Sequence, residues 1–116
     1  MKTILTSGGF DPLHVGHIRL FCEAKALGDI LLVVINDDKW LRRKKGRVFM
    51  SEAERYEVIH ALRDVDSIYI WHDEADHIAN AILKFKPDIF AKGGDRTSDN
   101  MPPEEIEACK KVGCEI

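Results

Sequence analysis

The sequence predicts an α/β fold, an open and doubly wound parallel sheet of four to five strands with helices on both faces. Short apolar stretches rich in β-branched residues alternate with stretches of helical periodicity, and the connections are a few residues long. Residues 30–35 (ILLVVI) are continuously apolar, which is typical of a parallel strand covered on both faces. Strands alternating with helices indicate right-handed βαβ units. In such sheets ligands bind beyond the carboxyl ends of the strands, so we expect the functional residues to follow the strands.

The first two strands are predicted to flank a helix. Residues 2–6 are β-rich and stop at a Ser-Gly-Gly turn, and residues 15–27 carry apolar side chains at helical spacing before Gly28. Residues 30–35 are the second strand. The basic stretch that follows, residues 36–47, is predicted to be an exposed, flexible loop.

The second half continues the alternation. Ser51 and Glu54 have the spacing of a capping box, which predicts a helix over residues 52–62 with Ala53, Tyr56 and Ile59 partly buried. The later predicted elements are a strand at 67–71, a helix at 75–85, a strand at 89–92, a helix at 103–112 opened by proline, and the first residues of a fifth strand at 114–116.

Composition restricts the class of protein. The chain has 116 residues with a net charge of −3, so residues 1–116 fit a single domain without the broad basic surface of a duplex nucleic-acid binder. Apolar residues make up 45%, enough for a core without disulfides, and the three cysteines form no Cys-x-x-Cys pair. No window reaches the roughly 18 apolar residues of a membrane span, and the first residues lack the features of a signal peptide. We therefore expect a cytoplasmic protein without membrane or nucleic-acid partners.

The segment with the clearest chemistry is residues 8–17, GGFDPLHVGH. Its glycines permit a sharp turn and a close approach of ligand to backbone, and the next helix begins near Val15, so free amides and the positive end of a helix dipole face the crevice. His14 and His17 lie three apart, on one side of the first turn, and Gly16 leaves room for a phosphate. This combination predicts stabilisation of charge on a phosphoryl group.

Other interpretations of the histidines remain open. An i, i+3 pair with Asp11 nearby also has the residue types of a metal site, and His14 and His17 could equally be ordinary polar side chains at a surface turn. A second stretch rich in metal-ligand types, residues 72–77 (HDEADH), is best interpreted as an acidic helix start. Asp37 and Asp38 follow the second strand where a dinucleotide fold binds ribose, but no G-x-G-x-x-G is present.

Residues 8–17 resemble the His-x-Gly-His signature of the cytidylyltransferase-like nucleotidyltransferases, which include glycerol-3-phosphate cytidylyltransferases and heptose-phosphate adenylyltransferase domains. The resemblance covers most of residues 3–100. It continues through residues 23–29 (EAKALGD), 34–38 (VINDD), 42–47 (RRKKGR), 54–55 (ER), 65–66 (VD) and 92–95 (KGGD). The last of these, with the basic loop, is more similar to the heptose-phosphate enzymes.

The resemblance implies a Rossmann-like fold and a reaction. An acceptor phosphate attacks the α-phosphorus of CTP or ATP, pyrophosphate leaves, and Mg²⁺ carried by the nucleotide bridges the phosphates. His14 and His17 are then the catalytic donors, and Lys44, with Lys45 as the alternative, spans acceptor and triphosphate. By analogy with relatives, a homodimer is expected. From the segment and the resemblance together, the expected nucleotide-binding residues are Gly8, Gly9, Phe10, Asp11, Gly16, Arg55, Gly94 and Asp95.

Three questions stay open at this stage. Arg55 alone is as well explained by a helix-surface salt bridge to Glu52 or Glu54. Family members also carry a serine- and threonine-rich signature after the fifth strand that residues 1–116 do not contain, which predicts a truncated domain. A nucleotide-binding module without catalysis and a metal-dependent hydrolase using Asp11, His14 and His17 are therefore the alternatives to a transferase, and neither the base nor the acceptor is determined.

Overall fold

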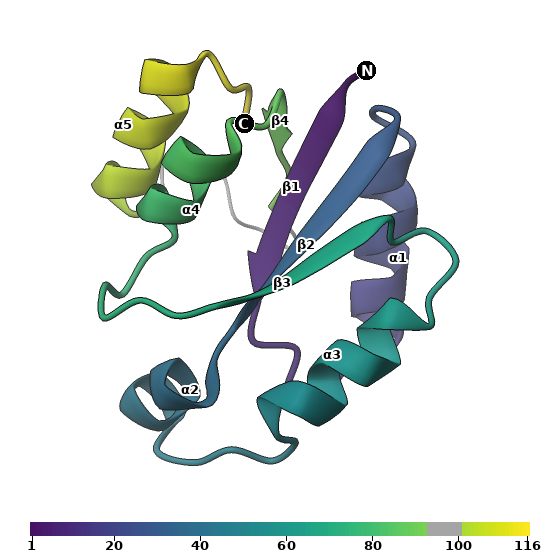
Figure 1. Cartoon of the computed structure of the whole chain (residues 1–116), viewed down its shortest axis with the longest axis vertical. Coiled ribbons are helices and arrows are strands. Elements are labelled where there is room, and N and C mark those ends of the chain that lie inside the picture. Colours follow the sequence, from purple (N-terminus) through teal and green to yellow (C-terminus); the bar gives the residue numbers. More distant parts are fainter. Residues whose placement is uncertain (93–100) are drawn as a thin grey trace.

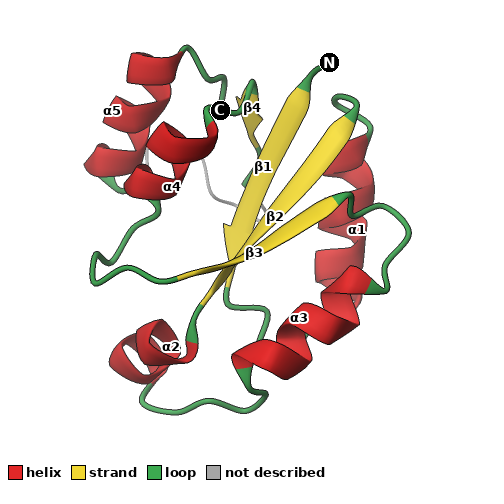
Figure 2. Cartoon of the chain, viewed as in Figure 1, coloured by secondary structure: helices red, strands yellow, loops and turns green. Residues whose placement is uncertain are grey.

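The sheet of this protein is parallel and lies between two layers of helices (Figures 1 and 2). The computed structural model describes residues 1–92 and 101–116, and within them four strands pair in the order β3-β2-β1-β4. This is the Rossmann-like order, so the predicted fold class is confirmed. No helix of the described residues is long and apolar enough to cross a membrane. The elements are β1 (Thr3–Gly8), α1 (Val15–Lys25), β2 (Ile30–Asn36), α2 (Asp38–Lys45), α3 (Glu52–His60), β3 (Ser67–Trp71), α4 (Ala79–Phe85), β4 (Ile89–Phe90) and α5 (Pro103–Val112).

The central strand β2 divides two hydrophobic cores. Successive strand residues point to opposite faces, so Leu31, Val33 and Ile35 pack with α1 and α3, whereas Leu32 and Val34 pack with α4 and α5. All five side chains are 5% exposed or less. The continuous apolarity of this strand predicted its burial on both faces correctly. Burial of each of these side chains stabilises the folded state by about 1.5–3 kcal/mol.

The strand register brings the polar segments to one edge of the sheet. Gly8 of β1 lies opposite Ile35 of β2, and Asn36 of β2 lies opposite Trp71 of β3. Three chain segments therefore leave the sheet at the same end, and α2 lies there too, beyond the carboxyl ends of β1 and β2 (Figure 1).

A fifth strand position begins beside β4. Glu115 forms a parallel bridge with Ile89, in which Phe90 N donates to Glu115 O over 2.7 Å and Glu115 N donates to Asp88 O over 2.9 Å. The strand predicted at residues 114–116 is thus present as a single bridge on the expected side of the sheet.

The basic stretch after β2 is helical, and the prediction of a loop was wrong. Asp37 caps the helix by accepting from Trp40 N, and Gly46 ends it in the left-handed conformation at φ 79°. Leu41 is fully buried and holds the helix on the rest of the fold. Four basic residues in its last turn interact favourably with the negative end of the helix dipole.

Two further predictions need correction. The third predicted helix begins at Ala79 rather than at residue 75, because residues 73–78 form a turn in which the Asp73 carboxylate accepts from Ala75 N, Asn80 Nδ2 and Trp71 Nε1. The acidic helix start expected over residues 72–77 is therefore absent. In α3 the buried residues are Arg55 and Ile59, whereas Ala53 and Tyr56 are exposed.

Candidate functional site

A pocket of about 820 Å³ opens at the carboxyl end of the sheet, a volume within the usual range for small-molecule sites. It contains most of the residues that the sequence singled out. Among them are Gly8, Gly9, Phe10, Asp11, His14, Gly16, His17, Lys44 and Lys45, and residues from the opposite side are Asp76, His77, Ile78, Lys92, Pro102 and Glu105.

The two histidines form the cap of α1. His14 is the N-cap residue, and its Nδ1 accepts from Gly16 N over 3.1 Å; His17 Nδ1 accepts from His14 N, also over 3.1 Å. The rings stack with centroids 3.9 Å apart. An Nδ1 that accepts a hydrogen bond carries no proton, so a neutral ring carries its proton on Nε2. Both imidazoles line the pocket, and in the neutral form each has an Nε2–H to donate.

The environment of His17 keeps its ring neutral. Burial lowers the pKa of His17 below its ordinary value of 6.5, and the neighbouring His14 and the Lys45 ammonium lower this pKa further. Gly16 is required by the same cap, because a Cβ there would lie 2.8 Å from His14 Cε1. The space that Gly16 leaves is filled by the imidazole that caps the helix, whereas the sequence suggested that it was left for a phosphate.

The turn before the histidines is held by tight packing. Phe10 is 5% exposed and adopts φ 51°, in the left-handed region that non-glycine residues rarely occupy. Its ring makes edge contacts with His17 and Phe21 at 5.0 and 5.3 Å between centroids. A Cβ on Gly8 would lie 3.0 Å from this ring, and one on Gly9 would lie 2.9 Å from Leu41 Cδ2. The two glycines therefore let Phe10 and α2 approach the backbone that lines the pocket.

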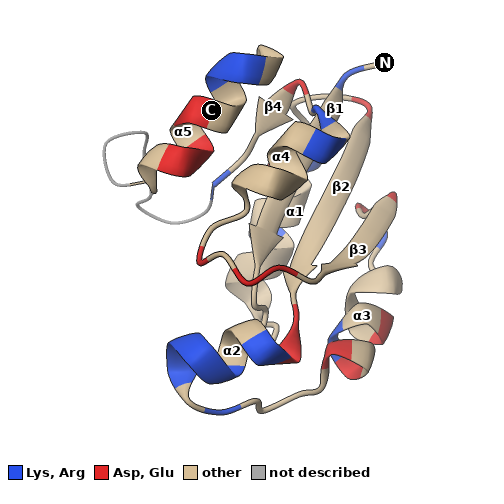
Figure 3. Cartoon of the chain, turned by 60° about the vertical axis from the view of Figure 1, so that its left-hand side comes forward, with Lys and Arg blue, Asp and Glu red and all other residues tan. Residues whose placement is uncertain are grey.

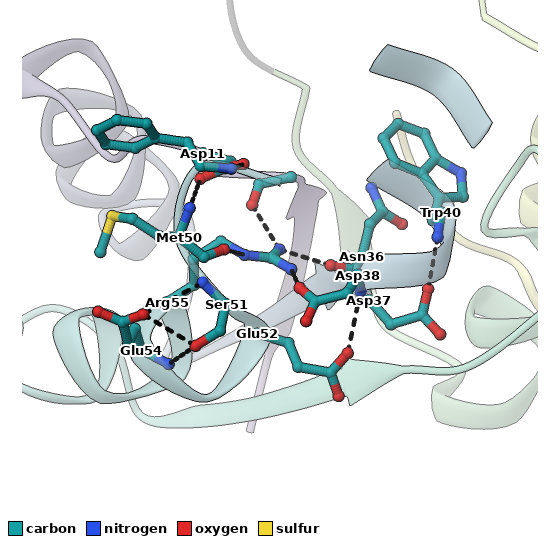
Figure 4. Close-up of polar contacts among 12 residues, drawn as sticks. Asp11, Asn36, Asp37, Asp38, Trp40, Met50, Ser51, Glu52, Glu54 and Arg55 are labelled. Atoms are coloured by element: carbon teal, nitrogen blue, oxygen red, sulfur yellow. Dashed lines mark hydrogen bonds and ion pairs between the residues drawn. The ribbon is translucent and has the colours of Figure 1, made fainter. Parts of the chain in front are cut away.

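Asp11 joins this turn to the start of α3. Its carboxylate accepts from Phe49 N and Met50 N over 2.7 and 2.6 Å (Figure 4). Both oxygens are used by the protein's own backbone, so Asp11 positions the pocket wall by binding the segment before Ser51.

Arg55 lies beneath the pocket and is fully buried. Its Nη1 donates to Gly9 O (2.8 Å) and Asn36 O (2.6 Å), its Nε donates to Met50 O (3.0 Å), and its Nη2 pairs with Asp38 Oδ1 at 2.7 Å (Figure 4). The expected alternative, a helix-surface salt bridge to Glu52 or Glu54, is wrong because the guanidinium points inward. Arg55 joins the ends of β1 and β2 to α3, and its side chain does not line the pocket.

Helix α2 carries a cluster of basic residues (Figure 3), and two of them, Lys44 and Lys45, line the pocket. Lys44 Nζ lies 3.5 Å from Asp76 Oδ2, and Arg43 Nε lies 3.7 Å from Asp76 Oδ1. These groups are 37–63% exposed, so the ion pairs are weak. Lys44 can therefore exchange Asp76 for a stronger anion.

Some expected groups are used elsewhere or lie outside the described residues. Gly94 and Asp95 fall outside the described ranges 1–92 and 101–116. Within those ranges no three His, Cys, Asp or Glu side chains gather as a metal-ion group. His72 Nδ1 instead lies 2.9 Å from Asp37 Oδ2, and His77 Nδ1 accepts from Ala79 N.

On the far wall of the pocket, Lys92 belongs to the 92–95 segment that the sequence indicated, whereas Glu105 was not expected there. One signal was available for Glu105. It shares a helical face with Ala108 and Cys109, all three are buried, and a charged residue on an apolar face of α5 indicates a special environment.

Comparisons with known proteins identify a family and relatives. A family model described as cytidylyltransferase-like matches residues 5–115. The "Bifunctional protein HldE" of Desulfatibacillum aliphaticivorans is 40% identical over 108 residues, and that of Nitrosococcus oceani is 40% identical over 111 residues; they cover 90% and 94% of this chain. The chain spans 22% of the length of each of these relatives. A solved "lipopolysaccharide core biosynthesis protein" from Thermoplasma volcanium GSS1 is 30% identical, with a TM-score of 0.80 over 100% of this chain and 92% of that one.

The buried position of Arg55 predicts a large loss of stability in Arg55→Met. This change leaves the carbonyls of Gly9 and Asn36 and the carboxylate of Asp38 without their donor, and we expect the free energy of unfolding to fall by about 3–5 kcal/mol. Chemical denaturation measures it. Arg63→Met, at an exposed position, is the control and should change stability by less than about 0.5 kcal/mol. Equal effects in the two variants would contradict the role given to Arg55.

The capping geometry predicts the tautomer of both histidines. Long-range ¹H–¹⁵N NMR at pH 7.5 should show the Nε2–H tautomer for His14 and His17, with the pKa of His17 below 6.5. Because the unfolded chain binds a proton there more readily than the folded chain, this histidine should lower stability as the pH falls below about 6.5, until its folded pKa is passed. An Nδ1–H tautomer in either ring would contradict the cap.

Proposed function

The chain belongs to the cytidylyltransferase-like family, and on that premise we propose that it transfers a nucleoside monophosphate from ATP or CTP to a phosphorylated small molecule. An oxygen of the acceptor phosphate attacks the α-phosphorus, the bond from that phosphorus to the bridging oxygen breaks, and pyrophosphate leaves. Mg²⁺ is proposed to arrive as part of the nucleotide, where it would offset the negative charge of the phosphates, and so belongs to the substrate.

One observation carries the proposal, the pair of Nε2–H donors in a pocket at a helix start. Phosphoryl transfer depends on positioning and on neutralising charge rather than on covalent chemistry. Two imidazoles locked by backbone hydrogen bonds are preorganised donors at the positive end of the α1 dipole. In this proposal they bind the triphosphate and stabilise the charge that develops as the pentavalent transition state forms.

Lys44 is proposed to bind acceptor and triphosphate together. Its ammonium is on an exposed helix edge, paired only weakly with Asp76, so it can move toward two phosphate groups and lower their mutual repulsion. Lys45, which lines the same pocket, is the alternative for this role. Arg55 is proposed to act from below, by fixing the Gly9 carbonyl and thereby the amides of the Gly9–Phe10 turn.

For the acceptor we propose a sugar or polyol phosphate, and among these a heptose phosphate first. The support is the similarity to proteins named HldE, together with the Lys92-Gly-Gly-Asp segment and the basic stretch, which resemble those of heptose-phosphate adenylyltransferases. The same similarity favours ATP over CTP. A homodimer remains a proposal by analogy with relatives.

Two other functions fit parts of the site. A nucleotide-binding module would use the same pocket without transfer. A metal-dependent hydrolase would need Asp11, His14 and His17 as ligands, but both Asp11 oxygens and both Nδ1 atoms already accept backbone hydrogen bonds.

The direct test measures pyrophosphate release from ATP and CTP with heptose phosphates, hexose phosphates and glycerol 3-phosphate. Acceptor-dependent release together with the matching nucleotide-linked product would establish transfer. Nucleotide binding without release would favour the binding module, and a stoichiometric transition metal with acceptor-independent hydrolysis would favour the hydrolase.

The two donors should matter for turnover more than for folding. His14→Asn keeps an N-cap acceptor but removes the Nε2–H, so we expect kcat to fall by about 10²- to 10³-fold with little change in melting temperature. His17→Ala should give a similar loss of turnover. Nucleotide affinity, measured by calorimetry, should change much less. Full activity in either variant would remove that histidine from the mechanism.

Replacing the lysines should weaken the use of both substrates without destabilising the fold. Lys44→Ala is expected to raise the KM of acceptor and of nucleotide together and to leave the melting temperature unchanged, because its ion pair is exposed. The matched control is Lys39→Ala, on the same helix but outside the pocket lining. An unchanged kcat/KM in the double variant Lys44→Ala, Lys45→Ala would make this helix an ordinary basic surface.

A further inference from the structure

Glu105 is a buried carboxylate with one oxygen left without a hydrogen bond. The residue is 3% exposed, and its Oε2 accepts from Ile78 N over 3.1 Å. Its Oε1 is the only buried side-chain nitrogen or oxygen atom of the described residues that has no hydrogen-bond partner. Native proteins leave very few such atoms, and each needs an explanation.

Lys92 neutralises this carboxylate without satisfying it. Lys92 Nζ lies 3.2 Å from Oε1, an ion pair that does not reach hydrogen-bond geometry, and the ammonium also lies over the Phe90 ring at 4.7 Å. The Lys92 side chain is 12% exposed. Two desolvated charges are costly to bury, so a pair that leaves an acceptor free is a poor device for stability alone.

The Glu105 side chain lies at the wall of the pocket. Glu105, Lys92 and Ile78 all line it, on the α4–α5 side, whereas the histidines and glycines line it from β1 and α1. A carboxylate repels phosphate and accepts only from donors, so Oε1 would pair with a neutral O–H of the ligand rather than with its phosphates.

We propose that Glu105, whose carboxylate forms an ion pair with Lys92, accepts a hydrogen bond from a sugar hydroxyl of the bound substrate. This inference rests on the proposed function and adds to it a group that recognises the sugar. The hydroxyl comes either from the ribose of the nucleotide or from the ring of a sugar-phosphate acceptor. The shared chemistry is an O–H donor aimed at a buried carboxylate, and such bonds are among the stronger ones.

The test measures by calorimetry how tightly the whole chain and its variants bind pairs of ligands that differ by one hydroxyl. It does not depend on nucleotide transfer. One arm compares ATP with 2′-deoxy-ATP and 3′-deoxy-ATP, and the other compares a heptose phosphate with its monodeoxy analogues. Each is titrated into the wild type, Glu105→Gln and the control Glu107→Gln, a change on the exposed face of the same helix. Glu105→Asp, which keeps the charge but withdraws the oxygen, is a second variant if the glutamine variant is unfolded.

One of the two arms contains the ligand whose hydroxyl binds Glu105. In that arm, the wild type and Glu107→Gln should bind the complete ligand with about 10- to 100-fold higher affinity than one of its deoxy analogues. Glu105→Gln and Glu105→Asp should bind both forms with similar affinity. The arm that shows this loss identifies ribose or acceptor as the source.

Two results would overturn the subsite, and they differ from a failure of the proposed function. The first is that the wild type binds complete and deoxy ligands equally well in both arms. The second is that both Glu105 variants still prefer the complete ligand as the wild type does. Either result would show that Glu105 does not bind a ligand hydroxyl. If the wild type binds no nucleotide and no sugar phosphate at all, the proposed function itself fails, and the subsite with it.

Discussion

The buried guanidinium of Arg55 is the interaction on which the site depends. It replaces the water that would otherwise solvate the carbonyls of Gly9 and Asn36, which lie at the carboxyl ends of two adjacent strands, Gly9 directly after β1 and Asn36 as the last residue of β2. Its charge is balanced by Asp38 at the start of α2. The planar guanidinium offers donors at fixed angles. One side chain therefore fixes the direction of the chain where it leaves β1, where it leaves β2 and where it enters α3. A lysine, with a single ammonium on a flexible stem, cannot make these contacts together.

The sequence was sufficient for the sheet and for one wall of the pocket, for reasons that lie in local physics. The run from Ile30 to Ile35 is apolar at every position, so only burial on both faces satisfies it, and the structure places Leu31 and Leu32 in separate cores. His14 and His17 come directly after a strand and at a helix start. Their convergence on the pocket follows from connectivity alone, since parallel strands bring their carboxyl ends to one edge.

The other features of the site depend on contacts between residues far apart in the chain, and the sequence did not predict them. Nothing local distinguishes Arg55 from Arg63, because its burial depends on carbonyls 19 and 46 positions away. Helix α2 has one buried residue, Leu41, so its apolar pattern is too weak to indicate a helix, although the Asp37 cap and the Gly46 end were available signals. Likewise the pairing of Lys92 with Glu105 joins β4 to α5 through space, and only the position of Glu105 on an apolar helix face hinted at it.

The donors proposed to bind the triphosphate are of two kinds, imidazoles fixed by backbone hydrogen bonds and exposed lysines of α2, and this division suits the proposed chemistry. Both imidazoles are held by backbone amides through Nδ1, and burial with nearby positive charge lowers the pKa of His17, so this donor needs no proton from solvent to act. A neutral donor fixed in place gains most where charge is developing, since it binds the ground state only modestly. The lysines of α2 are solvated and weakly paired with Asp76, so they can follow a phosphate as it enters and leaves. A site built only of buried ammonium groups would hold pyrophosphate too well to release it; fixed neutral donors with exposed cations stabilise the transition state and still let the product go.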